Sequence, residues 1–342
     1  MNNTEMYVPL FICPLCQSPL IPAADTWRCD GSLHPKQTSH PFDVARQGYV
    51  NLLPVQQKKS KAPGDSQQSI DARQRFLNAE YYQPLQALIC QQMSELFTQA
   101  KSDIKLTAVE DNNKREISWL DIGCGEGYYT QAMAQTGMDA LIAADISKPA
   151  LASLAKASKA ANRLWYQQNP QANNETNNEA NNAEVKAAAI YPLVTSAAHL
   201  PLPAHSMMGI SSIFSPILPA AFADVLQDGG YLLIAKPDVG HLSSVRAALF
   251  DEVREHDSYK FLPTLAPYFK LIDTLHVSND LHLSVEALTD LLTMTPYAYR
   301  ARIEKRQALL ATTASQAFTT EAKFVVYILQ KIATTSLITE TK

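Results

Sequence analysis

Three of the chain's eleven glycines fall within five residues, in the segment WLDIGCGEGYYT. They are Gly123, Gly125 and Gly127, and they follow an apolar stretch at residues 117–122 that has the length of a buried strand. A strand that ends in a glycine turn and leads into a helix lets a ligand lie directly against the backbone. This feature predicts a strand–turn–helix unit of a parallel sheet, with a binding site at the turn.

Strands and helices keep alternating after this turn, which is typical of a doubly wound parallel sheet. The helix that follows the turn, at residues 128–137, should close at Gly137. The last two apolar stretches, residues 269–278 and 321–332, are expected to pair as antiparallel strands at one edge of the sheet. The remaining expected elements are strands at residues 140–147, 190–196, 207–215 and 231–237, and helices at residues 148–166 and 220–230.

The spacing of the glycines distinguishes two classes of cofactor. A dinucleotide fingerprint, G-x-G-x-x-G, leaves two residues before its last glycine and holds a pyrophosphate at the helix N-terminus. Here only one residue separates neighbouring glycines, and the carboxylate of Glu126 would repel a pyrophosphate. Asp121 could meet a positively charged methionine group, and Asp145 could accept both hydroxyls of a ribose. The pattern favours S-adenosylmethionine over a nicotinamide or flavin cofactor, or over a purely structural turn.

Three of the five cysteines lie near the start of the chain: Cys13 and Cys16 in CPLC, and Cys29 after twelve intervening residues. Such a pair and a second pair of ligands from a facing turn form a closed, tetrahedral zinc site. Spacing alone leaves the fourth ligand open between His34 and His40. Free cysteines in a small core and a redox C-x-x-C are the alternatives, and the lack of a surrounding β–α–β pattern weighs against redox chemistry.

These features divide the chain into a small N-terminal module and a larger domain. Pro84 should begin the second of two helices between residues 70 and 99. Six of the ten residues at 173–182 are asparagine, which predicts a disordered insertion, at residues 162–186, that cannot contribute to a core. The expected segments are a zinc-binding module at residues 1–55, a linker with helices at residues 56–110, and the cofactor-binding domain at residues 111–336.

Charge and hydropathy exclude some partners. The net charge is −4 and the pI about 6.1, so any contact with nucleic acid must be local rather than due to bulk charge. No apolar run approaches the roughly 18–20 residues that a membrane helix needs, and the start of the chain lacks the pattern of a signal peptide. We therefore expect a cytoplasmic protein without membrane contact.

Several segments together resemble the 23S rRNA guanine-N1 methyltransferases, from about residue 11 to the C-terminal strand. They are CPLC, WRC, HPFDVARQGYVNLLPVQQKKSKAPGDS, ARQRFLNAEYYQPL, LDIGCGEGYYT and MTPYAYRARIE. The resemblance implies a class I methyltransferase fold, Rossmann-like and α/β, with an N-terminal zinc-ribbon module, and it implies a homodimer. It also implies that S-adenosylmethionine methylates N1 of one guanine in a hairpin loop of 23S rRNA, and that the Zn²⁺ is structural.

The resemblance selects further site residues. The family's fourth zinc ligand is a histidine followed by x-Phe-Asp, which matches His40, although the loop from Cys29 is longer here. Tyr82 in YQPL and His241 in VGHLSS match residues that contact the cofactor in the family. The expected cofactor-binding set is Tyr82, Asp121, Gly123, Cys124, Gly125, Glu126, Gly127, Asp145 and His241, and the expected metal ligands are Cys13, Cys16, Cys29 and His40.

Contacts with the substrate are less specific in the sequence. Ser215 and Pro216 follow the fourth core strand, where related enzymes present a substrate platform, and a simple strand-ending turn explains them equally well. The segment FSPILPAAF has lost the polar character that the family carries there, and no general base is assigned. Basic residues that could hold RNA phosphates, or form a solvated face, are Arg46, Lys58, Lys59, Lys61, Arg73 and Arg75, with a second group of Arg300, Arg302, Lys305 and Arg306.

Three other functions compete with the leading one. A nicotinamide-dependent oxidoreductase is disfavoured by the glycine spacing, and a cofactor-binding test would separate the two. A noncatalytic zinc-ribbon protein would bind RNA without transferring a methyl group. A methyltransferase of a small molecule would leave the zinc module and the lysines unexplained, whereas one acting on another RNA would not.

Overall fold

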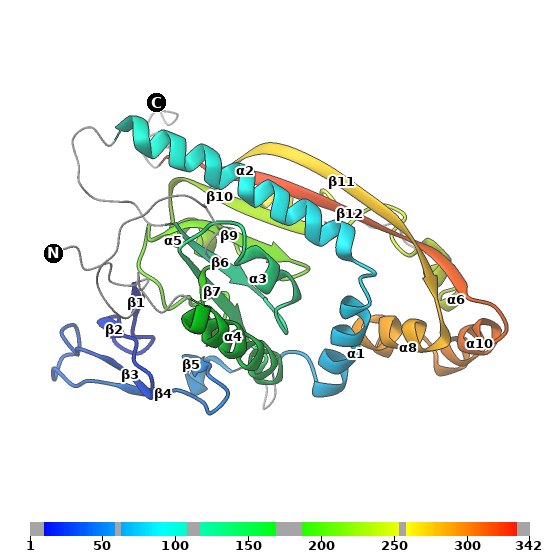
Figure 1. The fold of residues 1–342 in the computed structure, drawn as a ribbon, viewed down its shortest axis with the longest axis horizontal. Helices are drawn as coiled ribbons and strands as arrows, with labels where there is room; N and C mark the ends of the chain where they lie inside the picture. The colour runs from blue at the N-terminus through cyan, green and yellow to red at the C-terminus, as the bar shows by residue number, and fades with distance from the viewer. Residues whose placement is uncertain (1–9, 59–62, 108–116, 169–186, 253–257, 334–342) are drawn as a thin grey trace.

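The computed structural model describes residues 10–58, 63–107, 117–168, 187–252 and 258–333 (Figure 1). Eight strands of these residues form one large sheet in the order β11-β12-β10-β9-β6-β7-β8-β5. The strands are β5 (Val50–Asn51), β6 (Ser118–Ile122), β7 (Ala140–Asp145), β8 (Ala189–Val194), β9 (Met207–Ile213), β10 (Leu226–Pro237), β11 (Phe269–Leu283) and β12 (Phe318–Lys331). The expected α/β fold with a doubly wound sheet is confirmed.

The middle of the sheet is parallel and one end is antiparallel. Strands β10, β9, β6, β7, β8 and β5 pair in parallel, whereas β12 runs antiparallel to both β10 and β11. The antiparallel pair expected near the C-terminus is therefore confirmed, with β11 as the edge strand. Strand order reverses between β6 and β9, and ligands of open α/β sheets bind at such a point, beyond the carboxyl ends of the strands.

The helices follow from local signals that are legible in the sequence. The hydroxyl of Ser66 accepts a hydrogen bond from the backbone N–H of Ser69 and so caps the first helix. Pro84 lies in the first turn of the second helix, as expected. The helices are α1 (Gln67–Asn78), α2 (Gln83–Thr107), α3 (Tyr128–Met133), α4 (Lys148–Gln168), α5 (Pro219–Val225), α6 (Ser243–Leu249), α7 (Leu262–Leu265), α8 (Val285–Met294), α9 (Tyr297–Arg300) and α10 (Ile303–Thr313), with a 3-10 turn η1 (Val55–Gln57).

Successive residues of the central strands face two different hydrophobic cores. Trp119 of β6 belongs to a core that it shares with residues of α1, α2 and α3, whereas Leu120 belongs to a core on the opposite face of the sheet. The second core contains Phe222 of α5 together with Phe11 and Trp27 from the N-terminal module. The module therefore covers one face of the sheet in the way that a layer of helices covers the other.

The N-terminal module is a small antiparallel sheet in the order β1-β2-β3-β4. Its strands are β1 (Phe11–Ile12), β2 (Pro19–Ile21), β3 (Thr26–Cys29) and β4 (Pro41–Asp43). The backbone N–H of Ile12 donates to the carbonyl of Pro201 at 3.0 Å, and β5 joins the large sheet beside β8. The boundary of the zinc-binding module expected at residue 55 therefore falls after β5, a strand that already belongs to the large sheet.

Two details differ from the sequence expectations. The helix expected at residues 220–230 is wrong in its second half, because α5 ends at Val225 and β10 begins at Leu226. The pairing of β10 with β9 shifts register between Leu226 and Tyr231, and Gly229 adopts a φ of +76° there. The second difference is at residue 162, where the insertion was expected to begin, because helix α4 continues to Gln168; residues 169–186 lie outside the described residues.

Among described residues, no helix has both the length and the hydropathy needed to cross a membrane.

Candidate metal centre and cofactor site

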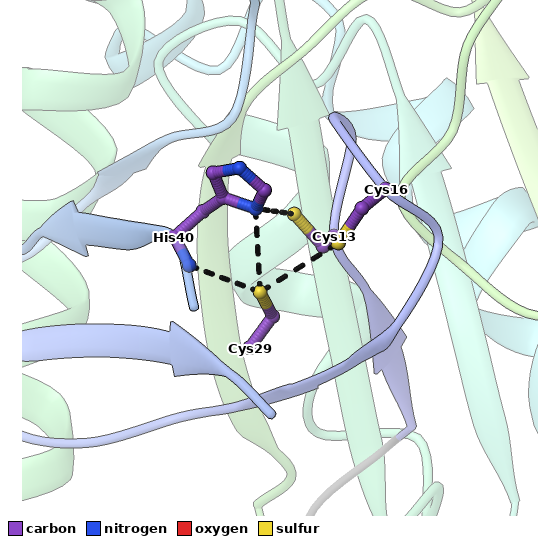
Figure 2. Close-up of side chains that lie close together, drawn as sticks. All are labelled: Cys13, Cys16, Cys29 and His40. Carbon is purple, nitrogen blue, oxygen red and sulfur yellow. Dashed lines mark hydrogen bonds between the residues drawn. The ribbon is translucent and has the colours of Figure 1, made fainter. Parts of the chain in front are cut away.

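The predicted zinc ligands come together in the N-terminal module (Figure 2). Cys13 follows β1, Cys29 ends β3 and His40 precedes β4, so the ligands lie at facing ends of two hairpins. A turn closed by the hydrogen bond from the N–H of Gln17 to the carbonyl of Cys13 brings Cys16 to the same point. The four ligand atoms all lie within 4.8 Å of one another.

The spacing of these atoms fits a tetrahedral zinc ion. The sulfurs of Cys16 and Cys29 are 3.7 Å apart, and Nδ1 of His40 is 3.6 Å from the sulfur of Cys13 and 3.5 Å from that of Cys29. With bonds of about 2.3 Å to sulfur and about 2.0 Å to nitrogen, a tetrahedron has edges of roughly 3.8 Å and 3.6 Å. Three thiolates and one imidazole leave no open position for water, which is the donor set of a structural zinc site.

The structure also distinguishes the two candidate histidines. Nδ1 of His34 accepts hydrogen bonds from the backbone N–H groups of Lys36 and Thr38, so this ring stabilises its own loop. Its ring lies edge-on to that of His40 at 5.1 Å between centroids, outside the cluster of ligand atoms. The longer loop after Cys29 is therefore accommodated without any change of ligand.

The glycine turn connects β6 to α3 at the carboxyl end of the sheet. Gly123 has a φ of +70°, and its N–H donates to the carbonyl of Ala144 on β7 at 2.7 Å. A Cβ at this glycine would lie only 2.3 Å from the Cβ of Ser215, which follows β9. The turn is thus wedged between the ends of β7 and β9, and only glycine fits at position 123.

Asp121 lies beneath the turn rather than in it. Its side chain is 2% exposed, and its two oxygens accept hydrogen bonds from the hydroxyls of Thr130 at 2.6 Å and Ser211 at 2.7 Å. Burial raises the pKa of this carboxyl to about 6, while the two hydroxyl donors oppose that shift. Both oxygens are therefore committed to joining β6, α3 and β9.

Asp145 lies at the end of β7, where the sequence predicts a ribose ligand. Its oxygens accept hydrogen bonds from the N–H of Gly125 at 2.9 Å and of Ser147 at 2.7 Å. Burial raises the pKa of this carboxyl, and the two backbone donors pull it back towards the ionised form. A carboxylate with one N–H on each oxygen keeps lone pairs for two hydroxyl groups, as a ribose requires.

The side chain of Glu126, a residue expected in the cofactor-binding set, has its charged partner within the chain. It is 4% exposed and forms an ion pair with Arg73 of α1 at 3.3 Å. The same guanidinium pairs with Asp65, and it lies 3.3 Å from the position that a Cβ on Gly125 would occupy. Burial raises the pKa of Glu126 and the cation opposes the shift. The charge of Glu126 is therefore compensated within the chain, and repulsion by Glu126 does not exclude a pyrophosphate.

The segment PGDS, residues 63–66, packs against the turn after β7. Gly64 has a φ of +87°, and a Cβ there would lie 2.6 Å from the Cβ of Ser147. The hydroxyl of Ser147 donates to the carbonyl of Asp65 at 3.0 Å. This family-like motif thus closes the cofactor site beside Asp145, a role that the sequence alone did not reveal.

The two residues expected to contact the cofactor by resemblance lie in one aromatic cluster. The ring of Tyr82 packs on Phe324 at 4.7 Å and lies 6.3 Å from His241 and 6.5 Å from Phe214. His241 is held by Nδ1, which lies 2.8 Å from the backbone carbonyl of Lys323 and 3.1 Å from its N–H. Tyr82 and His241 are both about 5% exposed, so both rings are buried within this cluster.

Cys124 also lies in the glycine turn, half-buried. Burial and the neighbouring carboxylates of Asp145 and Asp121 hold the pKa of its thiol well above the usual value. The thiol therefore stays protonated and packs as a small apolar group, which leaves it no nucleophilic role.

The first group of basic residues expected to bind RNA consists of Arg46, Lys58, Lys59, Lys61, Arg73 and Arg75. Arg73 pairs with Asp65 and Glu126, and Arg75 pairs with Asp290 of α8 at 2.6 Å, so the structure assigns both guanidinium groups to carboxylates of the chain instead. Arg46 is exposed and Lys58 half-buried. Lys59 and Lys61 lie outside the described residues.

The second expected group of basic residues lies near the C-terminus. In this group, Lys305 pairs with Asp251, Arg306 is half-buried, and Arg300 and Arg302 are exposed.

Sequence reasoning missed some residues that complete the site. Thr130 and Ser211 are the partners of Asp121, and Thr130 could have been found because it lies in the first turn of the helix directly after the glycine turn. Arg73, which its basic neighbourhood linked to RNA, also pairs with Glu126 of the glycine turn. Arg73 and Glu126 are fifty-three residues apart in the sequence, so no local sequence pattern predicts their contact.

Comparison with known proteins agrees with this arrangement. Residues 11–61 match the family described as RlmA, N-terminal, a zinc ribbon, and residues 93–275 match the family described as Methyltransferase domain. A Streptomyces fradiae protein named 23S rRNA (guanine(748)-N(1))-methyltransferase is 27% identical over 84% of this chain and 85% of its own. The Bacillus subtilis protein YxjB, which carries the 23S rRNA (guanine-N(1)-)-methyltransferase name in provisional form, is 27% identical over 71% of this chain and 70% of its own.

A solved structure, the YcgJ protein of Bacillus subtilis, is 15% identical, covers 68% of this chain and 99% of its own, and has a TM-score of 0.38. The residues described above fit S-adenosylmethionine at the glycine turn and zinc in the ribbon. The second family match covers more than half of the chain. The chain therefore belongs to the methyltransferase-domain family of S-adenosylmethionine-dependent enzymes, with a zinc ribbon of the RlmA type at its N-terminus.

Proposed function

We propose that this enzyme methylates N1 of a guanine in a hairpin loop of 23S rRNA. The observation that carries the proposal is the fusion of an RlmA-type ribbon to the methyltransferase sheet. Phe11 and Trp27 of the ribbon share a core with the sheet, and β5 extends the sheet beside β8. A small-molecule methyltransferase has no use for such a layer, whereas the relatives that carry the enzyme name act on rRNA.

The reaction requires a nucleophile, a methyl donor and a route for one proton. S-adenosylmethionine supplies an electrophilic methyl carbon on a sulfonium when it is bound. Guanine N1 carries a proton and its lone pair is delocalised into the ring, so the proton must leave as the new N–C bond forms. On transfer, N1 would gain the methyl group, the electron pair of the broken C–S bond would remain with the sulfur, and the N1 proton would pass to solvent or to an acceptor. Much of the rate then comes from holding N1 in line with the methyl group.

The residues of the chain divide the work of binding the donor. The carboxylate of Asp145 would accept the ribose hydroxyls with lone pairs that Gly125 and Ser147 leave free. Asp121 holds β6, α3 and β9 together beneath the turn, and its carboxylate would stabilise the sulfonium electrostatically without direct contact. Tyr82 and His241, which match residues that contact the cofactor in the family, would lie beside the rest of the donor.

Recognition of RNA would be local, given the negative net charge. Exposed Arg46 beside the ribbon, together with Lys58 where the ribbon leads to α1, is the described part of a surface that could hold phosphates. An rRNA substrate implies a cytoplasmic location. A homodimer stays a prediction, which light scattering of the purified chain would test.

The decisive experiment is a methylation assay on RNA that lacks the modification. Purified protein and labelled S-adenosylmethionine are incubated with naked 23S rRNA, with assembling particles and with 16S rRNA as the control. Primer extension then locates the product, because a methyl group on N1 blocks base pairing. Label on 23S rRNA with a stop one nucleotide before a single guanine is the expected result.

Each rival function has its own outcome in the same assay. Label on 16S rRNA alone would indicate a different RNA substrate. Binding of RNA without label, although S-adenosylmethionine binds, would indicate a noncatalytic RNA-binding protein. If the protein bound a nicotinamide cofactor and did not bind S-adenosylmethionine, the result would support the oxidoreductase hypothesis over the methyltransferase.

A further inference from the structure

Phe214 is the first residue after β9, and its backbone is strained. Its φ of +54° lies in the left-handed region, which a bulky side chain adopts only when the surrounding structure forces it. The side chain is nevertheless 41% exposed, unlike the other large aromatics of the central strands. An aromatic ring held in an unfavourable conformation and left open to solvent needs an explanation other than core packing.

The strain is stabilised by anchors on both sides of the residue. The N–H of Phe214 donates to the carbonyl of Ala235 on β10 at 3.0 Å. The hydroxyl of Ser215 donates to the carbonyl of Ile122 at 2.7 Å, and Nζ of Lys236 donates to the carbonyl of Ser215 at 2.6 Å. These bonds fix the chain at the point where strand order reverses, directly beside the glycine turn. The ring of Phe214 is thereby held beyond the carboxyl end of β9, at the switch point where ligands of open α/β sheets bind.

The neighbours of this ring describe a site for a flat, partly polar group. The centroid of Phe214 is 5.5 Å from that of Phe324 and 6.3 Å from that of Tyr129. The hydroxyl oxygen of Tyr129 is buried and has no hydrogen-bond partner among the described residues. A buried phenol without a partner costs free energy unless a ligand supplies one. The ligand that fits is therefore planar and carries a hydrogen-bond acceptor.

We propose that Phe214 stacks on the target guanine after it leaves the RNA stack, and that the hydroxyl of Tyr129 donates to its O6. This inference rests on the proposed function, because it takes guanine as the substrate. Aromatic side chains commonly stack on unpaired bases of RNA, and a base must be exposed before it can reach a pocket. Guanine offers a flat face and, at O6, the acceptor that Tyr129 lacks.

The hydrogen bond to O6 also assists the chemistry. When N1 loses its proton, the negative charge is shared with O6, so a donor at O6 is bound more strongly in the transition state than in the ground state. The phenol keeps its own proton, because burial holds the pKa of Tyr129 well above its usual value. Tyr129 is thus a donor throughout and not the base that removes the N1 proton.

Four variants test the proposal on the RNA that wild-type protein methylates: Phe214→Leu, Phe214→Tyr, Tyr129→Phe and, as a matched control, Tyr128→Phe. Stacking is worth about 1–3 kcal/mol per base, so Phe214→Leu should lower kcat/KM for RNA about 5- to 150-fold while Phe214→Tyr retains most activity. Tyr129→Phe should lower kcat and move the rising limb of its pH profile to higher pH, and Tyr128→Phe should do neither. Binding of S-adenosylmethionine, measured by calorimetry, and the melting temperature should stay close to wild type in all four.

Wild-type kcat/KM in Phe214→Leu would overturn the stacking role, and an unshifted pH profile in Tyr129→Phe would overturn the role of the hydroxyl. Loss of S-adenosylmethionine binding in proportion to activity would assign both residues to the donor instead of the base. If wild-type protein itself methylates no RNA, the proposed function fails, and that result does not depend on any variant. Fluorescence of 2-aminopurine beside the target base gives a second measure, since Phe214→Leu should reduce the change on binding that Phe214→Tyr preserves.

Discussion

The ion pair between Arg73 and Glu126 gives a quantitative test of how the cofactor site is held. Glu126 is 4% exposed, whereas the side chain of Arg73 is 23% exposed and that of its second partner, Asp65, is 47% exposed. Removing one partner of a fully buried pair costs roughly 3–5 kcal/mol. Because the cation is partly solvated, we expect Arg73→Met to lower the free energy of unfolding by about 2 kcal/mol. A shift of the melting temperature of about 3 °C follows for a chain of this size.

The loss should depend on pH in a defined direction. Burial raises the pKa of Glu126 above its ordinary 4.5 and Arg73 lowers it, so removing the cation raises it further. A carboxyl whose pKa is higher in the folded chain than in the unfolded chain loses stability as pH rises through that window. The deficit of Arg73→Met should therefore be small below pH 4.5 and grow towards neutral pH.

Melting curves between pH 4 and pH 8 provide the assay, with Arg75→Met as the matched control. Arg75 pairs with Asp290 but is 63% exposed, so the free energy of unfolding of this variant should stay close to that of wild type at every pH. The double variant Arg73→Met/Glu126→Gln should recover most of the loss, since a neutral amide needs no counter-ion. A deficit that does not change with pH, or no recovery in the double variant, would refute the electrostatic account.

Three further predictions concern the turn, the metal and the ribose. Gly123→Ala should abolish methyl transfer and reduce S-adenosylmethionine binding at least tenfold by calorimetry, because its Cβ would collide with Ser215 at 2.3 Å. Cys29→Ser should lower the zinc content of the purified protein, measured by mass spectrometry, whereas His34→Ala should leave it unchanged; equal loss in both would contradict the ligand set. Asp145→Asn should raise the dissociation constant of S-adenosylmethionine about 10- to 100-fold with little change in melting temperature, and an unchanged constant would remove Asp145 from the ribose site.

Local signals predicted those parts of the fold that depend on local physics. The β6–turn–α3 unit follows from an apolar strand and three glycines, and the ribbon follows from thiol spacing. The helix expected at residues 220–230 failed because Leu226 gains more from pairing with Met207 across the sheet than from continuing α5. Tertiary pairing overrode propensity there.

The site was predicted in its chemistry but not in its connections. Asp145 lies where the sequence placed a ribose ligand, at the end of the second core strand. Glu126 and Arg73 were expected at the cofactor and at RNA, and the ion pair between them was not predicted, because it forms only where α1 packs beside the glycine turn. Only the folded chain brings residues so far apart in sequence into contact.

For the proposed rRNA substrate, the pairing of β5 with β8 bears on how a single nucleotide would be selected. Because Val50 and Asn51 are hydrogen-bonded into the sheet, the ribbon cannot swing on a tether and keeps a constant span to the end of β9. If the ribbon bound an RNA hairpin, the distance from the ribbon to the methyl donor would be fixed. Only a base at that distance along the hairpin would reach the donor. Selectivity of this kind would depend on the length of the stem and loop before it depended on the identity of any base.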